Sequence, residues 1–176
     1  MSSQSAASST SALNRQFSPR LIVCPIDGSE NSIRAVGVGA SLAKLFGSEL
    51  LLIAVVSIPM MGVETPGAGF TLEDYRRSVE SDLEKAIENG LQVARQAGIN
   101  ASGEVIQNST SVVHSIIDTS EKKQADLIVI GTRGLGGFKR LVLGSVSDGV
   151  VSHAHCSILV LRFRDSRSLT LLRGWG

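Results

Sequence analysis

The chain has 176 residues, 43% of them hydrophobic, and a formal net charge of +1. This length is typical of one domain with a sizeable core. The near-neutral charge excludes bulk electrostatic attraction as the basis for binding nucleic acid, and no apolar run is long enough for a membrane-spanning helix. We therefore expect neither nucleic acid nor a membrane as a partner.

The two ends of the chain differ in composition from its middle. Residues 1–19 are rich in Ser and Ala, with one Arg and no acid, and they lack the apolar segment of a secretory signal. We interpret them as a disordered N-terminal extension, residues 20–163 as one domain, and residues 164–176 as a C-terminal tail. Cys24 and Cys156 lack metal-site spacing and predict buried, reduced thiols. A cytoplasmic location fits these features; the alternative is an organelle, reached through the Ser-rich N-terminus.

The first part of the domain alternates short apolar runs with helix-period segments. The apolar run at 21–26 predicts a buried strand that ends at Asp27. Ser29 is suited to cap a following helix, and the run at 49–56 predicts a second strand. Residues 57–70 contain two prolines and three glycines, so we expect a loop there.

The middle of the chain continues the alternation. Thr71 and Asp74 form a capping-box pattern at the start of a long amphipathic helix. Residues 102–107 predict a third strand, Ser111 is a candidate cap for the next helix, and residues 127–130 predict a fourth strand.

The last part adds one helix and one strand. Residues 145–155 predict a short helix, and residues 157–163 a fifth strand. Five strands separated by helical segments indicate right-handed crossovers. The predicted fold is α/β: an open, five-stranded, mainly parallel sheet in the order 3-2-1-4-5, with helices on both faces, a Rossmann-like arrangement.

A glycine-rich stretch between the fourth strand and the last helix is the most informative segment. Gly131 follows the strand, Gly134 lies in the loop, and Gly144 and Ser145 precede the helix. Glycines let backbone amides face an anion closely, and a helix start adds unpaired N–H groups and a partial positive charge. Ser145 and Ser147 add hydroxyl donors. The candidate phosphate-binding cations are Arg133, Lys139 and Arg140.

Two better-known glycine motifs do not fit this stretch. The chain has no G-x-x-x-x-G-K-[ST] run of the Walker type, and the dinucleotide fingerprint G-x-G-x-x-G is not completed, because Lys139 stands where its last glycine would be. A flexible linker is also disfavoured, since linkers rarely join a buried strand to a helix within a compact domain. A phosphate-binding loop is therefore the preferred interpretation.

The predicted strand order gives this loop a partner. With the order 3-2-1-4-5, the first and fourth strands are neighbours where the winding direction reverses, and ligands of such sheets bind at that point. Asp27 would lie beside Gly131, which gives an acceptor at one end of a crevice and amide and cationic donors at the other. A nucleotide has the same polarity. For Asp27 alone, helix capping and ligand binding remain equal alternatives.

At these residues the chain resembles the universal stress protein family, in its ATP-binding branch. The branch motif G-x2-G-x9-G-[ST] is met by Gly131, Gly134, Gly144 and Ser145, and the segment 21–29 is similar to the family's first strand and turn. The resemblance covers about residues 20–162. It implies a fold like that of the adenine nucleotide alpha hydrolases, a regulatory or stress-response role, and ATP with Mg²⁺ or Mn²⁺ as ligand.

The resemblance also implies the residues that would contact the nucleotide. Those expected near adenine and ribose are Pro25, Ile26, Asp27 and Val55, with core packing an equal alternative for Val55. Those expected to border the ribose and phosphates are Ile130, Gly131, Gly134, Gly144, Ser145, Val146 and Ser147. No metal site formed by protein side chains alone is implied. Replacing Gly131 by valine is expected to abolish binding and leave the fold largely intact.

The chain lacks a recognisable catalytic set. His114, His153 and His155 fall on predicted helices away from the crevice, and no Ser/His/Asp arrangement is indicated. We expect an ATP-binding regulatory module with at most slow hydrolysis. The alternatives are an adenylating or flavoprotein-like enzyme of the same architecture, and an interaction protein that binds no nucleotide. Family members commonly form homodimers through the last strand, and the apolar edge at 157–163 gives a physical reason for such pairing.

Overall fold

The strands of the computed structural model, which describes residues 17–57, 71–109, 111–132 and 143–163, form one parallel sheet in the order β3-β2-β1-β4-β5. This confirms the predicted α/β fold and strand order, and the predicted strands and last helix agree with the structure to within two residues at each end. The elements are β1 (Leu21–Pro25), α2 (Glu30–Phe46), β2 (Glu49–Ser57), α3 (Leu72–Gln96), β3 (Ala101–Ser109), α4 (Val112–Lys122), β4 (Leu127–Gly131), α5 (Ser145–His153) and β5 (Ser157–Leu161).

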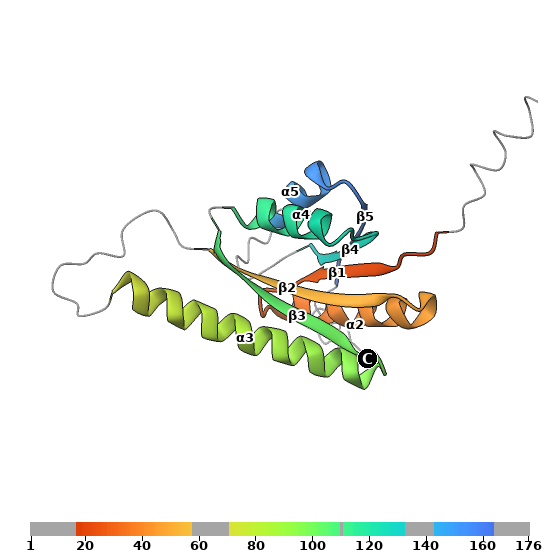
Figure 1. Ribbon diagram of the computed structural model, residues 1–176, viewed down its shortest axis with the longest axis horizontal. Coiled ribbons are helices and arrows are strands. Elements are labelled where there is room, and N and C mark those ends of the chain that lie inside the picture. Colours follow the sequence, from red (N-terminus) through yellow and green to blue (C-terminus); the bar gives the residue numbers. More distant parts are fainter. Residues whose placement is uncertain (1–16, 58–70, 110, 133–142, 164–176) are drawn as a thin grey trace, which may run out of the picture.

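Helices cover both faces of the sheet. Helices α2 and α3 lie on one face, and α4 and α5 on the other (Figure 1). Neighbouring residues of β1 therefore point into different cores: Cys24 packs with α2, whereas Val23 packs with Ile116 of α4. Because β1, β2 and β4 are buried on both faces, their sequences are continuous apolar runs rather than alternating ones.

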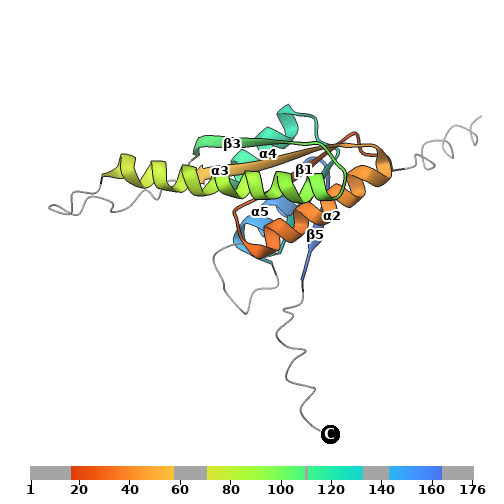
Figure 2. The same ribbon diagram turned by 90° about the horizontal axis from the view of Figure 1, so that it is seen from below.

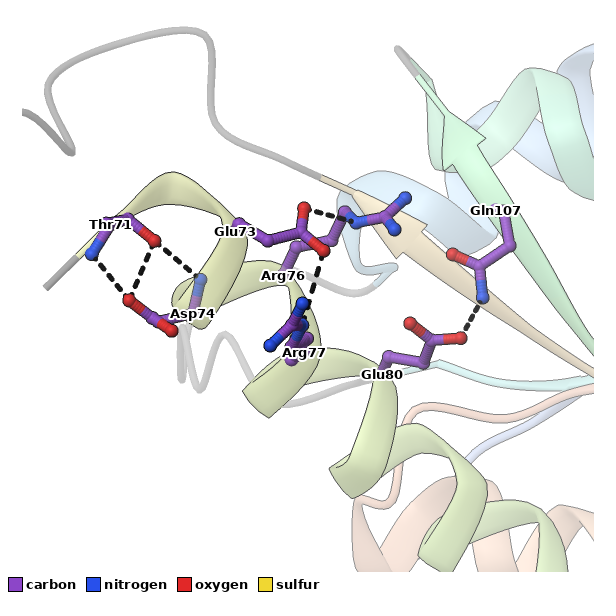
Figure 3. A network of polar contacts seen from close by, with 7 residues as sticks. All are labelled: Thr71, Glu73, Asp74, Arg76, Arg77, Glu80 and Gln107. Carbon is purple, nitrogen blue, oxygen red and sulfur yellow. Dashed lines mark hydrogen bonds and ion pairs between the residues drawn. The ribbon is translucent and has the colours of Figure 1, made fainter.

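The predicted helix caps are confirmed. The Ser29 hydroxyl accepts a hydrogen bond from the Ser32 N–H at 3.2 Å, and the Ser111 hydroxyl accepts one from the His114 N–H at 3.3 Å. At the start of α3, Thr71 and Asp74 form the reciprocal capping box that their spacing predicts (Figure 3). These caps satisfy N–H groups that would otherwise lack a partner at the helix starts.

The long helix α3 is held differently along its length. Its fully buried residues all lie in its second half, against the sheet; they are Ala86, Ile87, Gly90 and Ala94. Its first turns carry polar contacts instead: Glu73 pairs with both Arg76 and Arg77, and Glu80 accepts a hydrogen bond from Gln107 of β3 (Figure 3). Figure 2 shows α3 running alongside β3. The Glu73 pairs lie within the helix, so of these contacts only the Glu80–Gln107 hydrogen bond joins the first half of α3 to the sheet.

The last strand is shorter than predicted. Strand β5 ends at Leu161 rather than at residue 163, because its partner β4 ends at Gly131 and the Thr132 N–H makes the last bond, to the Leu161 carbonyl, at 2.9 Å. Phe163 instead turns to α2, where the Arg34 guanidinium carbon lies 4.3 Å from its ring centre. The side chain of Phe163 thereby packs against the α2–α3 core.

Three helices end in the same way, with one residue in the left-handed conformation. Two of these residues are glycines, Gly47 (φ 71°) and Gly98 (φ 81°), but the third is Gln124 (φ 57°), after α4. The following Ala125 N–H bonds to the Ser120 carbonyl at 2.8 Å and closes the turn. A side chain is unfavourable in this conformation, so Gln124 carries strain that the two glycines avoid.

Replacing Gln124 by glycine is expected to stabilise the protein by about 0.5–1 kcal/mol, since the left-handed penalty exceeds the extra entropy that glycine loses on folding. Lys123→Gly is the comparison at a residue with φ −82°, which gains nothing from glycine and also loses its ion pair with Glu104. Urea unfolding measures both variants against the wild type. A Gln124→Gly variant no more stable than the wild type would contradict this account of the turn.

Among the described residues, no helix is both long enough and apolar enough to span a membrane.

Candidate functional site

The carboxyl ends of β1 and β4 lie side by side. The strands pair in parallel, with Ile22 opposite Leu127 and Val23 opposite Ile128. The chain leaves β1 for α2 on one face of the sheet and leaves β4 for α5 on the other face (Figure 1). This is the reversal point at which open α/β sheets bind ligands, and it brings Asp27 and Gly131 to the same edge, as predicted.

Gly131 allows the start of α2 to approach the end of β4. A Cβ atom placed on Gly131 would lie 3.2 Å from the Asn31 carbonyl oxygen and 3.4 Å from the Asn31 Cβ. A larger residue would therefore press on the first turn of α2. This changes the expectation for Gly131→Val. The variant could lose nucleotide binding because α2 is displaced as well as because the site is blocked. A test of the site therefore needs a substitution at another residue.

Thr132 closes the base of the glycine-rich loop. Its carbonyl accepts a hydrogen bond from the Gly144 N–H at 2.7 Å, where the chain returns from the loop, and its own N–H is bonded to β5. The Ser147 hydroxyl lies 2.9 Å from the Gly144 carbonyl and 3.3 Å from the Thr132 carbonyl. Both Thr132 and Ser147 are buried. The end of β4 and the start of α5 are thus joined directly.

The start of α5 differs from the other helix starts in that none of the described side chains caps it. Its N-cap is Gly144, with extended backbone (φ −76°, ψ 160°), and Ser145 at the first helical position is exposed. The N–H groups of Ser145, Val146 and Ser147 belong to the first turn, where an α-helix offers them no acceptor. Together with the helix dipole they form a positive end suited to an anion.

Several predicted site groups have partners within the fold. The Gly144 N–H and the Ser147 hydroxyl make the hydrogen bonds at the base of the loop described above. A contact between Ser147 and a ligand would therefore involve the backbone N–H of Ser147. The Asp27 carboxylate accepts a hydrogen bond from the Ser29 N–H at 3.0 Å, and the Asp27 N–H lies 3.4 Å from the Ser32 hydroxyl. Asp27 therefore shapes the turn into α2, whereas the residue that caps this helix is Ser29.

The apolar residues predicted to contact the nucleotide lie partly at the carboxyl ends of the strands and partly in the hydrophobic core. Pro25 ends β1, and the side chain of Ile26 is buried in the α2–α3 core, with its N–H bonded to the Ile53 carbonyl at 2.8 Å. Val55 near the end of β2 and Ile130 in β4 both face the α4–α5 side. Val55 is half-buried and packs against that core, so core packing accounts for at least part of its side chain.

The remaining predicted site residues, which are Arg133, Gly134, Lys139 and Arg140, lie outside the described residues. Within the described ranges, no group of three or more His, Cys, Asp or Glu side chains could hold a metal ion. Sequence reasoning missed Thr132 and Asn31. The position of Thr132 between Gly131 and the loop was a signal for it, but nothing local marks Asn31 as the neighbour of Gly131, because that contact joins two distant segments.

Comparison with known sequences gives one consistent result. Residues 19–162 match the sequence model of the universal stress protein family. A universal stress protein of Methanocaldococcus jannaschii is 32% identical over 142 residues, which cover 80% of this chain and 81% of that protein. The universal stress protein YxiE of Bacillus subtilis is 31% identical over 143 residues, covering 78% and 95% of the two chains.

Solved structures support the same fold. The universal stress protein UspA of Lactobacillus plantarum has a TM-score of 0.72 at 23% identity, over 84% of this chain and all of that one. A family protein from Arabidopsis thaliana, solved with AMP bound, has a TM-score of 0.60 at 17% identity, over 85% and 95%. A universal stress protein in complex with cAMP has a TM-score of 0.62 at 20% identity, over 82% and 98%.

Proposed function

The chain belongs to the universal stress protein family, and from this premise we propose that it is an ATP-binding regulatory module of the stress response. The nucleotide would lie across the carboxyl ends of β1 and β4, with adenine and ribose near residues 25–27 and Val55. The phosphates would lie between Gly131 and the start of α5. Family structures solved with AMP and with cAMP are consistent with an adenine nucleotide as ligand.

One observation carries this proposal: the start of α5 has no cap from any described side chain and lies directly beside the end of β4. The Thr132–Gly144 hydrogen bond holds the two segments together. Three first-turn N–H groups and the helix dipole would then meet the β- and γ-phosphates, and each charge-assisted hydrogen bond contributes about 1.5–3 kcal/mol. Arg133, Lys139 and Arg140 are proposed as further phosphate contacts.

A divalent cation is proposed to bind with ATP. Within the described residues the chain offers no cluster of metal-binding side chains, so Mg²⁺ or Mn²⁺ would be held mainly by phosphate oxygens and water, as Mg²⁺ usually is in nucleotide sites. The exposed Ser145 hydroxyl is the described side chain best placed to reach such an ion at the start of α5. The effect of adding and removing Mg²⁺ on ATP affinity tests this part of the proposal.

The test of the proposed function is to identify and then titrate the nucleotide. Purified protein is denatured and its released small molecules are analysed by mass spectrometry; nucleotide-free protein is then titrated calorimetrically with ATP, AMP and cAMP. We expect ATP to bind at least about tenfold tighter than AMP, because only ATP places further phosphates at α5. Equal affinity for ATP and AMP would contradict this placement. Release of flavin, or of an adenylate formed from ATP, would favour an enzyme. The absence of any nucleotide binding would favour an interaction protein.

We propose at most slow ATP hydrolysis. His153 and His155 lie at and just beyond the end of α5, the end remote from the proposed phosphates. His114, in contrast, lies in the first turn of α4, after β3, and so at the carboxyl edge of the sheet, where it is exposed. Phosphate release from ATP by the wild type and by a His114→Ala variant therefore measures both the rate and any part that His114 has in it.

We also propose that the chain forms a homodimer through β5. This strand pairs only with β4 among the described elements, and its residues from Ile158 to Leu161 are half-exposed and apolar. Pairing with a second copy would cover this edge. Sedimentation velocity over a range of concentrations is expected to show a dimer. A monomer at every concentration would contradict the pairing without affecting the nucleotide site.

A further inference from the structure

A cleft lies beside the amino ends of β4 and β5, at the opposite end of these strands from the proposed nucleotide site. This cleft has a volume of about 180 Å³ and is formed by the end of α4, the turn before β4, and the turn between α5 and β5. An apolar cavity of about 150 Å³ is known to hold benzene. The cleft is therefore large enough for one ring-sized molecule.

The floor of the cleft is apolar. It is formed by Ile117 of α4, Ala125 in the turn before β4, Ile128 of β4, and Ala154 after α5. Ile128 is fully buried in the α4–α5 core, Ala125 and Ala154 pack against that core, and Ile117 is half-buried. Such a floor contributes binding energy by removing the apolar surface of a ligand from water.

The rim of the cleft favours a positive charge. Helices α4 and α5 both end at the cleft, and the C-terminal end of a helix carries a partial negative charge. The Glu121 carboxylate lies on the rim, together with Gln124 and His155, and all three residues are exposed. The two lysines beside the end of α4 are paired with carboxylates: Lys122 with that of Asp118 at 2.8 Å, and Lys123 with that of Glu104 at 3.1 Å.

A further carboxylate lies close to the cleft on its β4 side. Asp126 follows Ala125 and is close enough to Cys156 that its negative charge contributes, after burial, to raising the pKa of that thiol. Asp126 also pairs with Arg20 at 3.7 Å, so Glu121 and the two helix ends remain the main sources of negative potential. The combination of apolar floor and negative rim defines the chemistry of the occupant.

We propose that this cleft binds a small primary amine with an apolar, ring-sized body. The body would lie on the floor formed by Ile117, Ile128 and Ala154, and the ammonium group would face Glu121 and the ends of the two helices. This site is separate from the proposed nucleotide site, because the cleft lies at the amino ends of the strands and the nucleotide site at their carboxyl ends.

Benzylamine is a suitable probe, with benzyl alcohol as its uncharged counterpart. Methyl NMR spectra of the full chain are recorded at pH 8 during titration with each compound. We expect benzylamine to shift the methyl signals of Ile117 and Ile128 with a dissociation constant of about 1 mM. Benzyl alcohol is expected to bind about threefold more weakly, because a partly exposed charge pair contributes modestly. Equal binding of the two compounds, or the absence of shifts, would overturn the proposal.

Variants separate the floor from the rim. Ala154→Leu places a larger side chain in the cleft and should remove binding of both compounds, whereas Ser152→Leu adds the same bulk on an exposed part of α5 away from the cleft and should leave binding unchanged. Glu121→Gln should weaken benzylamine about threefold and leave benzyl alcohol unaffected. A binding site that survives Ala154→Leu in a folded protein would lie elsewhere and would refute the assignment.

Cys156 provides an independent readout, because it lines the cleft. Its thiol is expected to react slowly with iodoacetamide, since burial raises the pKa of Cys156. Cys24 is fully buried and should stay unmodified in the folded protein. Saturating benzylamine is expected to slow alkylation of Cys156 at least about threefold. An unchanged rate under conditions where the NMR shifts are complete would show that the amine lies outside the cleft.

Discussion

A Gly39→Ala variant is expected to be less stable than the wild type by about 1–3 kcal/mol, although alanine is the better helix former. Gly39 lies in the middle of α2, where the helix packs closely on β1. A Cβ atom at this position would lie 2.5 Å from the Cys24 Sγ and 3.4 Å from the Leu50 Cδ1. Cys24 has no exposed surface, so its short side chain has no room to retreat, and the helix must move away from the sheet.

The same helix supplies the control. A Cβ on Gly37 would be 3.8 Å from its nearest neighbour, the Val93 Cγ1, which is ordinary contact. Gly37→Ala is therefore expected to stabilise the protein by about 0.5–1 kcal/mol through helix propensity. Adding Cys24→Ala should recover part of the stability lost in Gly39→Ala, because it removes the sulfur atom from the position of the clash. Urea unfolding of the wild type, Gly39→Ala, Cys24→Ala and the double variant gives the coupling between the two positions. Equal stability of Gly39→Ala and Gly37→Ala would refute the close packing of α2 on β1.

The succession of strands and helices could be predicted because the features that mark these elements are local. The central strands are uninterrupted apolar runs, and Ser29, Thr71 and Ser111 mark where the intervening helices begin. The end of β5 could not be predicted, because it depends on where the neighbouring strand stops rather than on the residues of β5 itself. The left-handed conformation of Gln124 could not be predicted either, because glycine is the residue by which a sequence indicates that conformation.

The location of the candidate site could be predicted from the sequence, but the role of each polar group in it could not. The glycine spacing pointed to the segment between β4 and α5, and the structure brings the end of β1 beside it. Whether a polar group serves the fold or a ligand depends on hydrogen bonds between distant segments. The Gly144 N–H bonds to Thr132, and Asp27 binds within its own turn. The cleft near Cys156 could not be predicted for the same reason. Its lining residues come from separate segments, and none of these segments carries a sequence pattern that indicates a cleft.

Replacing Ser145 by proline is expected to weaken ATP binding about 10- to 100-fold with little effect on stability. Ser145 is the first residue of α5, where proline is tolerated because the helix provides no acceptor for that N–H. Gly144 already has the extended backbone that a residue before proline requires, with ψ 160°. The substitution thus removes one N–H group from the proposed phosphate contacts, a charge-assisted hydrogen bond of about 1.5–3 kcal/mol.

Two controls isolate the contribution of that N–H group. Ser145→Ala removes the hydroxyl but keeps the backbone N–H, so the difference in ATP affinity between the alanine and proline variants measures the N–H alone. Leu72→Pro places proline at the first position of α3, on an exposed residue at a helix start away from the β4–α5 junction, and should leave ATP affinity unchanged. If the proline and alanine variants of Ser145 bind ATP equally well, the phosphates do not lie at the start of α5. The nucleotide, if bound, would then have to be held by other groups, and the absence of a side-chain cap on α5 would need a different explanation.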